Sequence, residues 1–230
     1  NVILPNLSPA DIREIKRILD LMKAQYILLP DFSDTLDIPL ARPYRKIPRG
    51  GTALADIMAM GGSAATIQMG VTVEEGLSPG RLLEKEWGVP LYNIPVPMGV
   101  ENTDNFVGLL SRITGHPVPD ILERERGRLL DCMVDSHKHN FRGRSVVFGE
   151  PELVGALAGT CVENGIFPVV VATGSKNERL AGLIRPRLAE YQVNSVFLDE
   201  TDFFRIREQA VAMKANIAIG HSDGRYLTER

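Results

Sequence analysis

Two short polar segments have the residue types and positions that ligand binding requires. Thr173-Gly174-Ser175-Lys176 follows a run of valines, and His221-Ser222 follows the apolar residues 217–219. In open parallel α/β sheets, ligands bind beyond the carboxyl ends of the strands. We therefore predict a cofactor contact at His221 and Ser222, with an ordinary strand-to-helix turn as the alternative.

The segment Thr173, Gly174, Ser175 and Lys176 combines small residues, hydroxyls and a cation at a predicted helix start. Backbone N–H groups at such a start favour a negatively charged ligand, so we predict anion binding there. The phosphate-loop pattern GxxxxGK[ST] and the dinucleotide pattern GxGxxG are both missing. A plain turn is again the alternative.

Asp135, Ser136 and His137 supply the three residue types of a hydrolase triad in one run. Consecutive residues on a helix point about 100° apart, so these side chains diverge. A proton relay needs them to converge, and we therefore assign no catalytic residue.

The chain has two cysteines, Cys132 and Cys161, and neither belongs to a CxxC pair. A zinc or iron–sulfur site built from this chain alone is therefore not expected. We predict that both thiols are buried and act as small hydrophobic groups. His137 and His139 are two residues apart on a predicted helix and face different sides, so we assign no metal ligand.

The composition is that of a globular protein, with 44% apolar and 24% charged residues and a net charge of −3. A chain with a net negative charge lacks the positive electrostatic field that attracts nucleic acid, so we expect no nucleic-acid partner. No apolar run approaches the length of a membrane span, and no signal pattern is seen at the amino end, so we expect no membrane partner and a cytoplasmic location.

The alternation of apolar runs and amphipathic stretches predicts an α/β fold class: two Rossmann-like parallel β-sheet lobes flanked by helices and joined by a long helix. The expected divisions are a first lobe at 1–116, a connecting helix at 117–140 and a second lobe at 141–230, truncated at its C-terminus. Strands are expected at 2–4, 26–29, 64–68, 89–96, 145–148, 167–172, 195–198 and 217–219. One helix is expected to begin after Ser8, and a separate short helix is expected to end at Ala59. Further helices are expected at 81–87, 104–114, 123–139, 152–162, 180–191 and 203–213, and another is expected to start within 221–229.

Three helix starts have cap signatures. Ser8 is the expected N-cap of the first helix, with Pro9 at its first position and Asp11 in its first turn. Thr52 is expected to cap the helix that ends at Ala59. Either Asn102 or Thr103 is expected to cap the helix at 104–114.

The segment from Asp31 to Gly51 is polar, rich in proline and irregular. It contains the cations Arg42, Arg45, Lys46 and Arg49. One interpretation is an exposed loop. The other is an interface to another chain, because long ordered loops in compact domains usually have a function.

Two longer runs resemble a known family. They are GHPVPDILERERGRLLDCMVDSH at 115–137 and GRSVVFGEPELVGAL at 143–157. Both resemble the nitrogenase component 1 family, in particular its β-type chains. These chains include the β subunits of the molybdenum, vanadium and iron-only nitrogenases and the related scaffold for iron–molybdenum cofactor assembly.

The resemblance implies a subunit of three Rossmann-like domains, of which this chain looks like a fragment with the second and third. The intact oxidoreductase would reduce dinitrogen or a similar inert small molecule, using electrons from an ATP-hydrolysing iron protein. An iron–sulfur or molybdenum/vanadium–iron cluster would lie between this chain and a homologous α-type subunit. The family's cluster-binding cysteines lie upstream of the matched region, so the fragment alone is expected to bind no cluster and to be inactive.

Two other functions stay open at this point. The first is a non-catalytic scaffold for iron–molybdenum cofactor assembly. The second ignores the resemblance and takes the chain as an independent anion-binding α/β module.

Overall fold

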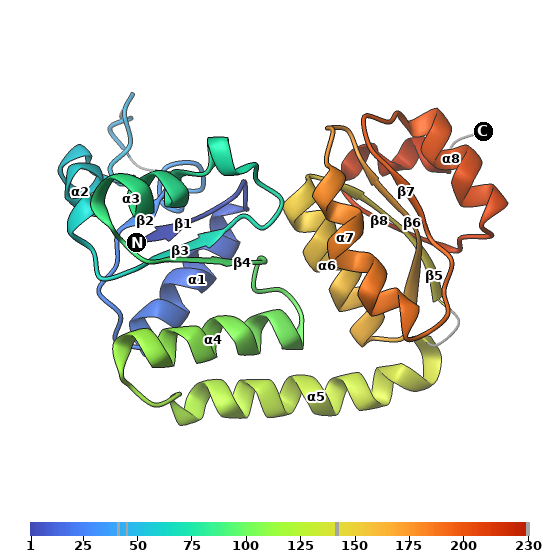
Figure 1. Ribbon diagram of the computed structural model, residues 1–230, viewed down its shortest axis with the longest axis horizontal. Coiled ribbons are helices and arrows are strands. Elements are labelled where there is room, and N and C mark those ends of the chain that lie inside the picture. The colour runs from blue at the N-terminus through green and yellow to red at the C-terminus, as the bar shows by residue number, and fades with distance from the viewer. Residues whose placement is uncertain (41, 45, 141–142, 229–230) are drawn as a thin grey trace. The chain divides into compact units, whose positions relative to one another are not determined.

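A computed structural model describes residues 1–40, 42–44, 46–140 and 143–228 of the chain. It contains two four-stranded sheets with all strands parallel, each flanked by helices (Figure 1). The predicted α/β class with two parallel sheets is therefore confirmed. The chain forms two compact units, unit 1 (Asn1–Ile94 and Asn105–Pro119) and unit 2 (Pro95–Asp104 and Asp120–Arg230). The lobe divisions at 1–116, 117–140 and 141–230 stay a prediction.

Unit 1 is built on a sheet with the strand order β2-β1-β3-β4. The strands are β1 (Val2–Ile3), β2 (Leu28–Leu29), β3 (Thr66–Met69) and β4 (Leu91–Ile94). The helices are α1 (Pro9–Leu21), α2 (Leu54–Ala59), α3 (Pro79–Trp87) and most of α4 (Val100–Thr114), with short 3-10 turns η1 (Met60–Gly62) and η2 (Glu75–Leu77).

Helix α1 forms where its sequence predicts. The Ser8 hydroxyl accepts a hydrogen bond from the backbone N–H of Asp11, and the Asp11 carboxylate accepts one from the backbone N–H of Ser8, which completes a capping box. The buried face consists of Ile12, Ile15, Ile18 and Leu19. Because these residues recur at helical spacing, one side of α1 packs into the core of unit 1.

Unit 2 is built on a sheet with the strand order β7-β6-β5-β8. The strands are β5 (Gly143–Gly149), β6 (Ile166–Thr173), β7 (Val196–Leu198) and β8 (Ile217–Ile219). The helices are α5 (Asp120–Asn140), α6 (Pro151–Glu163), α7 (Glu178–Ala189) and α8 (Phe203–Ala212), followed by the 3-10 helix η3 (Ser222–Leu227).

The sheet of unit 2 is buried on both faces, and each face has its own apolar cluster. Val147 packs with residues of α6 and α7, whereas the adjacent Val146 packs with Ile206 of α8. Figure 1 shows α6 and α7 covering one face of this sheet and α8 covering the other. Burial on both faces explains the continuous runs of valine in β5 and β6.

Strand β6 contains one extra residue relative to β5. Ser145 pairs with Pro168, but the next residue, Val146, pairs with Val170, so Val169 is an unpaired bulge. Val169 and Val170 consequently both belong to the cluster that contains Val146. The bulge lies next to a proline, which has no N–H to donate to the ladder.

Two of the predicted helix caps are wrong. The N-cap of α2 is Ala53, which makes no side-chain cap, while the Thr52 hydroxyl bonds elsewhere. Helix α4 begins at Val100, so Asn102 and Thr103 lie inside the helix. Its first N–H groups are instead bound by a carboxylate from α6, which no local pattern reveals.

Two further expectations are modified by the structure, and two predicted positions lie outside the described residues. Cys132 is exposed on α5, so the prediction that it is buried is wrong, whereas Cys161 is buried as predicted. The last predicted helix is the 3-10 helix η3, and Glu229, within its predicted range, lies outside the described residues. Arg45 of the long loop also lies outside them.

Candidate functional site

His221 lies at the carboxyl edge of the unit 2 sheet, as predicted. It follows β8, which pairs with β5 through Val147 and Ile219. Its ring contacts Phe148 at 5.3 Å and Phe203 at 5.7 Å between centroids, both edge-on. Its Nδ1 lies 3.6 Å from the carboxylate of Asp223. His221 is therefore held by aromatic neighbours with half its side chain exposed, and its role as a cofactor contact stays a prediction.

The second predicted site, Thr173–Lys176, lies at the end of β6. The Thr173 hydroxyl donates to the backbone oxygen of Ser175 at 2.5 Å and accepts from its backbone N–H at 3.1 Å. The N-cap of α7 is Asn177, whose side chain accepts from the N–H of Leu180 at 3.1 Å. The turn thus satisfies much of its own hydrogen bonding.

Lys176 has acidic neighbours. Its Nζ lies 3.3 Å from the carboxylate of Glu178. The hydrogen bond to Glu178 and its charge, together with the charges of Glu200 and Asp199, raise the pKa of Lys176. These carboxylates compete with an external anion for the lysine, and anion binding at this turn stays a prediction.

The two predicted sites are separate positions on the same edge. Strand β5 lies between β6, which ends at Thr173, and β8, which precedes His221. The residues brought next to Thr173 are instead those that follow β7. The N–H of Thr201 donates to the backbone oxygen of Thr173 at 3.3 Å.

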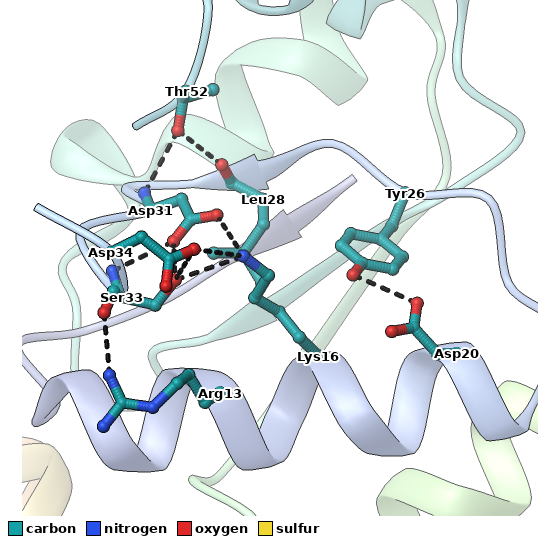
Figure 2. Close-up of polar contacts among 9 residues, drawn as sticks. All are labelled: Arg13, Lys16, Asp20, Tyr26, Leu28, Asp31, Ser33, Asp34 and Thr52. Atoms are coloured by element: carbon teal, nitrogen blue, oxygen red, sulfur yellow. Dashed lines mark hydrogen bonds and ion pairs between the residues drawn. The ribbon is translucent and has the colours of Figure 1, made fainter. Parts of the chain in front are cut away.

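A polar network that the sequence analysis did not predict lies at the carboxyl end of β2 (Figure 2). The Nζ of Lys16 lies 2.9 Å from the Asp31 carboxylate and 3.1 Å from the Ser33 hydroxyl. The second carboxylate oxygen of Asp31 accepts from the Ser33 hydroxyl at 2.6 Å and from its N–H at 3.1 Å. Ser33 is fully buried. We call Lys16, Asp31, Ser33 and Thr52 the loop-base network.

Thr52 closes this network from the far end of the loop. Its hydroxyl donates to the backbone oxygen of Leu28 at 2.6 Å and accepts from the N–H of Asp31 at 3.1 Å. Arg13 of α1 adds a hydrogen bond of 2.8 Å to the backbone oxygen of Ser33 (Figure 2). Both ends of the 31–52 segment are therefore attached to β2 and α1.

The pKa shifts of Asp31 and Lys16 both favour the charged forms of these two groups. Burial would raise the pKa of Asp31, but hydrogen bonds from Ser33 and Lys16 outweigh it and lower that pKa. Burial likewise disfavours the charge of Lys16, but the hydrogen bond to Asp31 and the charges of Asp31 and Asp34 raise the pKa of the lysine. Both groups stay ionised at neutral pH, which fits a structural ion pair better than a proton-transfer site. An Asp two residues before a Ser, directly after a strand, is the sequence signal that could have indicated this turn.

The run Asp135-Ser136-His137 does not form a triad. Asp135 pairs with Lys138 at 3.4 Å, and the Ser136 hydroxyl donates to the backbone oxygen of Met133 at 3.1 Å. His137 lies against Gly165. The three side chains thus have separate neighbours.

The described residues do not fit a metal cluster on their own. Within residues 1–40, 42–44, 46–140 and 143–228, no three His, Cys, Asp or Glu side chains gather closely enough to hold a metal ion. Burial raises the pKa of the Cys161 thiol, which keeps it protonated, and Cys132 stands alone on α5. Iron–sulfur clusters need several thiolates at one place. In the same part of the chain, no helix is long and apolar enough to cross a membrane.

Comparison with known proteins shows where this fold occurs. The model of the family described as "Nitrogenase component 1 type Oxidoreductase" matches residues 1–230. The structure described as "Nitrogenase Cp1 at pH 6.5" superposes with a TM-score of 0.91 and 32% identity, covering 99% of this chain and 50% of that one.

Curated relatives cover the same range. The molybdenum–iron protein β chain of Clostridium pasteurianum is 33% identical over 99% of this chain and 49% of its own length. The vanadium–iron protein β chain of Trichormus variabilis is 31% identical over 99% of this chain and 50% of its own length. The chain spans about half the length of the curated relatives it matches. Because the family match extends over all 230 residues, the chain belongs to the nitrogenase component 1 type oxidoreductase family.

Proposed function

We propose that this chain is part of a β-type subunit of a nitrogenase-type oxidoreductase. The intact complex would reduce dinitrogen or a similar inert small molecule with electrons from an ATP-hydrolysing iron protein. The observation that carries this proposal is the similarity to nitrogenase β chains over 99% of the chain. A homologous α-type subunit would be the permanent partner.

In this complex the described residues would shield the clusters from water. Iron–sulfur and molybdenum– or vanadium–iron clusters would supply the redox chemistry. Their ligands would come from other parts of the intact complex. The unit 2 sheet, apolar on both faces, excludes water from its interior. Shielding of this kind controls solvent access to a cluster, which is one determinant of its potential.

His221 and Ser222 are the residues we propose as the cofactor-side contact. Their place at the carboxyl edge of the unit 2 sheet supports this assignment. In the anaerobically purified complex, His221→Ala should alter the EPR spectrum of the bound cluster, while the control His116→Ala should leave it unchanged. Identical spectra for the His221→Ala variant and the wild type would rule the contact out.

The proposed function is tested with the full-length protein. It is coexpressed with its α-type partner, purified without oxygen, and assayed for iron, molybdenum and vanadium content and for ATP-dependent reduction of dinitrogen with the iron protein. Metal-loaded complex with substrate reduction is expected, and residues 1–230 alone should reduce nothing. Clusters that pass to an acceptor protein without substrate reduction would show an assembly scaffold instead. The absence of bound metal would contradict both readings.

A further inference from the structure

The segment between the two ends of the loop-base network forms an arch. A Cβ built on Gly50 would lie 3.4 Å from the Asp34 side chain, and one on Gly51 would lie 3.7 Å from the Asp31 backbone oxygen. The chain thus leaves and returns at the same place, where the Thr52 hydroxyl joins Leu28 to Asp31. We call residues 36–49 the arch. Of these residues the structure describes 36–40, 42–44 and 46–49, and the two ends of the segment are attached at one place beside the end of β2.

The arch and the helix that follows it expose apolar side chains. Large hydrophobic residues more than 70% exposed are Leu36, Leu40, Tyr44, Ile47, Leu54 and Met58. Single exposed hydrophobic residues are common on soluble proteins, but these six lie between Leu36 and Met58, and we take this stretch as a candidate interaction site.

Helix α2 (Leu54–Ala59) gives an independent indication. It has six residues and none of them is buried. Leu54 and Met58 are four residues apart and share one face of the helix. Helices this short are marginal in water without tertiary packing, so a covering surface would stabilise this one.

The charge of the arch indicates the kind of covering surface. Residues 38–52 contain Arg42, Arg45, Lys46 and Arg49 and no acidic residue. Three of these cations, Arg42, Lys46 and Arg49, are exposed and, within the described part of the chain, have no ion pair.

The acidic residues before the arch and at its start, Asp31, Asp34 and Asp37, already have partners within the chain. Asp37 lies 2.7 Å from Arg13, while Asp31 and Asp34 lie 2.9 and 3.7 Å from Lys16. Arg42, Lys46 and Arg49 are therefore available to carboxylates from outside the chain.

We propose that the arch and α2 dock against another protein chain whose surface carries carboxylates around an apolar groove. Cations without an ion pair, together with exposed apolar groups, match such a groove in both charge and polarity. Pro39, Pro43 and Pro48 restrict the backbone of the arch, which lowers the entropy cost of binding. A protein partner fits better than nucleic acid, because the whole chain carries a net charge of −3. The identity of the partner rests on the proposed function, within which it is the α-type chain.

The test compares matched pairs of exposed positions in the full-length protein. The apolar variant is Leu40→Ser with Ile47→Ser, and its control is Leu77→Ser, which is 74% exposed on η2. The charge variant is Arg42→Glu with Arg49→Glu, and its control is Lys85→Glu on α3, where the side chain is 83% exposed. Affinity for the purified α-type chain is measured at low and high salt.

Both arch variants should bind the α-type chain at least about tenfold more weakly than the wild type, and both controls should bind normally. The charge variant should also show a smaller dependence on salt. In the wild-type complex, the amide hydrogens of α2 should exchange more slowly than in the free chain. All substituted side chains are exposed, so the circular dichroism spectrum of each variant should match the wild type.

Wild-type affinity in both arch variants, or no protection of α2 in the complex, would overturn the docking surface and leave the proposed function intact. Failure of the wild-type chain to bind the α-type chain would overturn the proposed function together with this partner. Binding of the wild type and of the charge variant to vesicles containing phosphatidylserine and to a duplex DNA is measured as well. If the charge variant loses binding to either of them while its affinity for the α-type chain is unchanged, the arch serves a different kind of partner and the proposal fails.

Discussion

The Glu163 carboxylate accepts a hydrogen bond of 2.7 Å from the backbone N–H of Val100, and one of 3.0 Å from that of Glu101. The last residue of α6 thus caps the first turn of α4, over 60 residues away in sequence. Gly99 precedes this turn with φ = +81°, and a Cβ there would lie 2.6 Å from the Glu163 carboxylate. The positive φ favours glycine at this position, and a side chain there would also displace the Glu163 carboxylate from the helix start.

Glu163→Ala should release the first turn of α4. The two N–H groups would lose their carboxylate, and the helix dipole would lose its negative partner, at a cost of about 1 kcal/mol. The measurement is amide hydrogen exchange at Val100 and Glu101, which should become faster. Glu208→Ala, at an exposed position of α8, is the control and should leave both rates unchanged. Unchanged exchange in Glu163→Ala would show that the cap contributes nothing.

Asp31→Asn should loosen the base of the arch. The variant removes the ion pair with Lys16, whose side chain is 25% exposed, and weakens the bonds to Ser33. Hydrogen bonds to charged groups in such sites contribute about 1.5–3 kcal/mol, so a loss in this range is expected in the free energy of unfolding. Urea unfolding measures it. The exposed pair of Glu14 and Arg17 is the control, and Glu14→Gln should cost less than about 1 kcal/mol. Equal losses in the two variants would contradict a special role for Asp31.

The contribution of Asp31 should depend on pH in one direction. Because its folded pKa lies below the ordinary value of 3.8, the stabilisation is fully present above that value and is lost as the pH falls through the folded pKa. The gap in unfolding free energy between wild type and Asp31→Asn should therefore narrow below pH 3.8. The pKa of Lys16 is raised above 10.5, so the lysine stays charged and the gap should be constant around neutral pH. A gap that widens in acid would show the opposite pKa shift.

Gly220→Ala should destabilise unit 2. A Cβ at this position would lie 2.5 Å from the backbone oxygen of Phe148 and closer still to its ring. Overpacking of this kind costs about 1–3 kcal/mol. Gly182→Ala is the matched control, because Gly182 lies in α7 with no atom within 4 Å of its added Cβ. This control should gain about 0.5–1 kcal/mol from better helix propensity. Thermal unfolding of both variants distinguishes the two signs.

Phosphate tests the predicted anion site. If Thr173–Lys176 binds anions, millimolar phosphate should raise the melting temperature of the wild type, and Lys176→Ala should abolish the effect. Lys85→Ala, at an exposed position of α3, is the control and should keep the response. No stabilisation of the wild type would remove the anion-binding module from consideration.

Local sequence patterns predicted those parts of the fold that depend on neighbours in the chain. The Ser8 cap lies next to its helix, and the valines of β6 form a continuous apolar run, so both were predictable from short windows. The α4 cap was not, because its carboxylate comes from Glu163 in a different helix. The exposure of Cys132 was also missed, since the thiol sits on a long helix whose apolar stripe is only partly covered, with Val134 66% exposed.

Among the candidate sites, too, the feature that depends on neighbouring residues was predicted and the one that depends on distant residues was not. The place of His221 at the carboxyl edge followed from the strand pattern alone. The loop-base network was not predicted, because it joins Lys16 of α1 to Asp31 and Ser33 across the end of a strand. Pairings of this kind depend on the relative positions of α1 and β2, which single-residue patterns do not encode.

The bulge at Val169 determines how the unit 2 sheet ends. Pro168 has no N–H to offer, and β7 pairs with β6 only from Val170 to Ala172. The Ser195 hydroxyl, 2.6 Å from the Pro168 oxygen, takes the place of the next ladder bond. The edge strand β7 is consequently three residues long. An edge this short gives a stray strand little to pair with, so an irregularity in the interior of the sheet protects its border against aggregation.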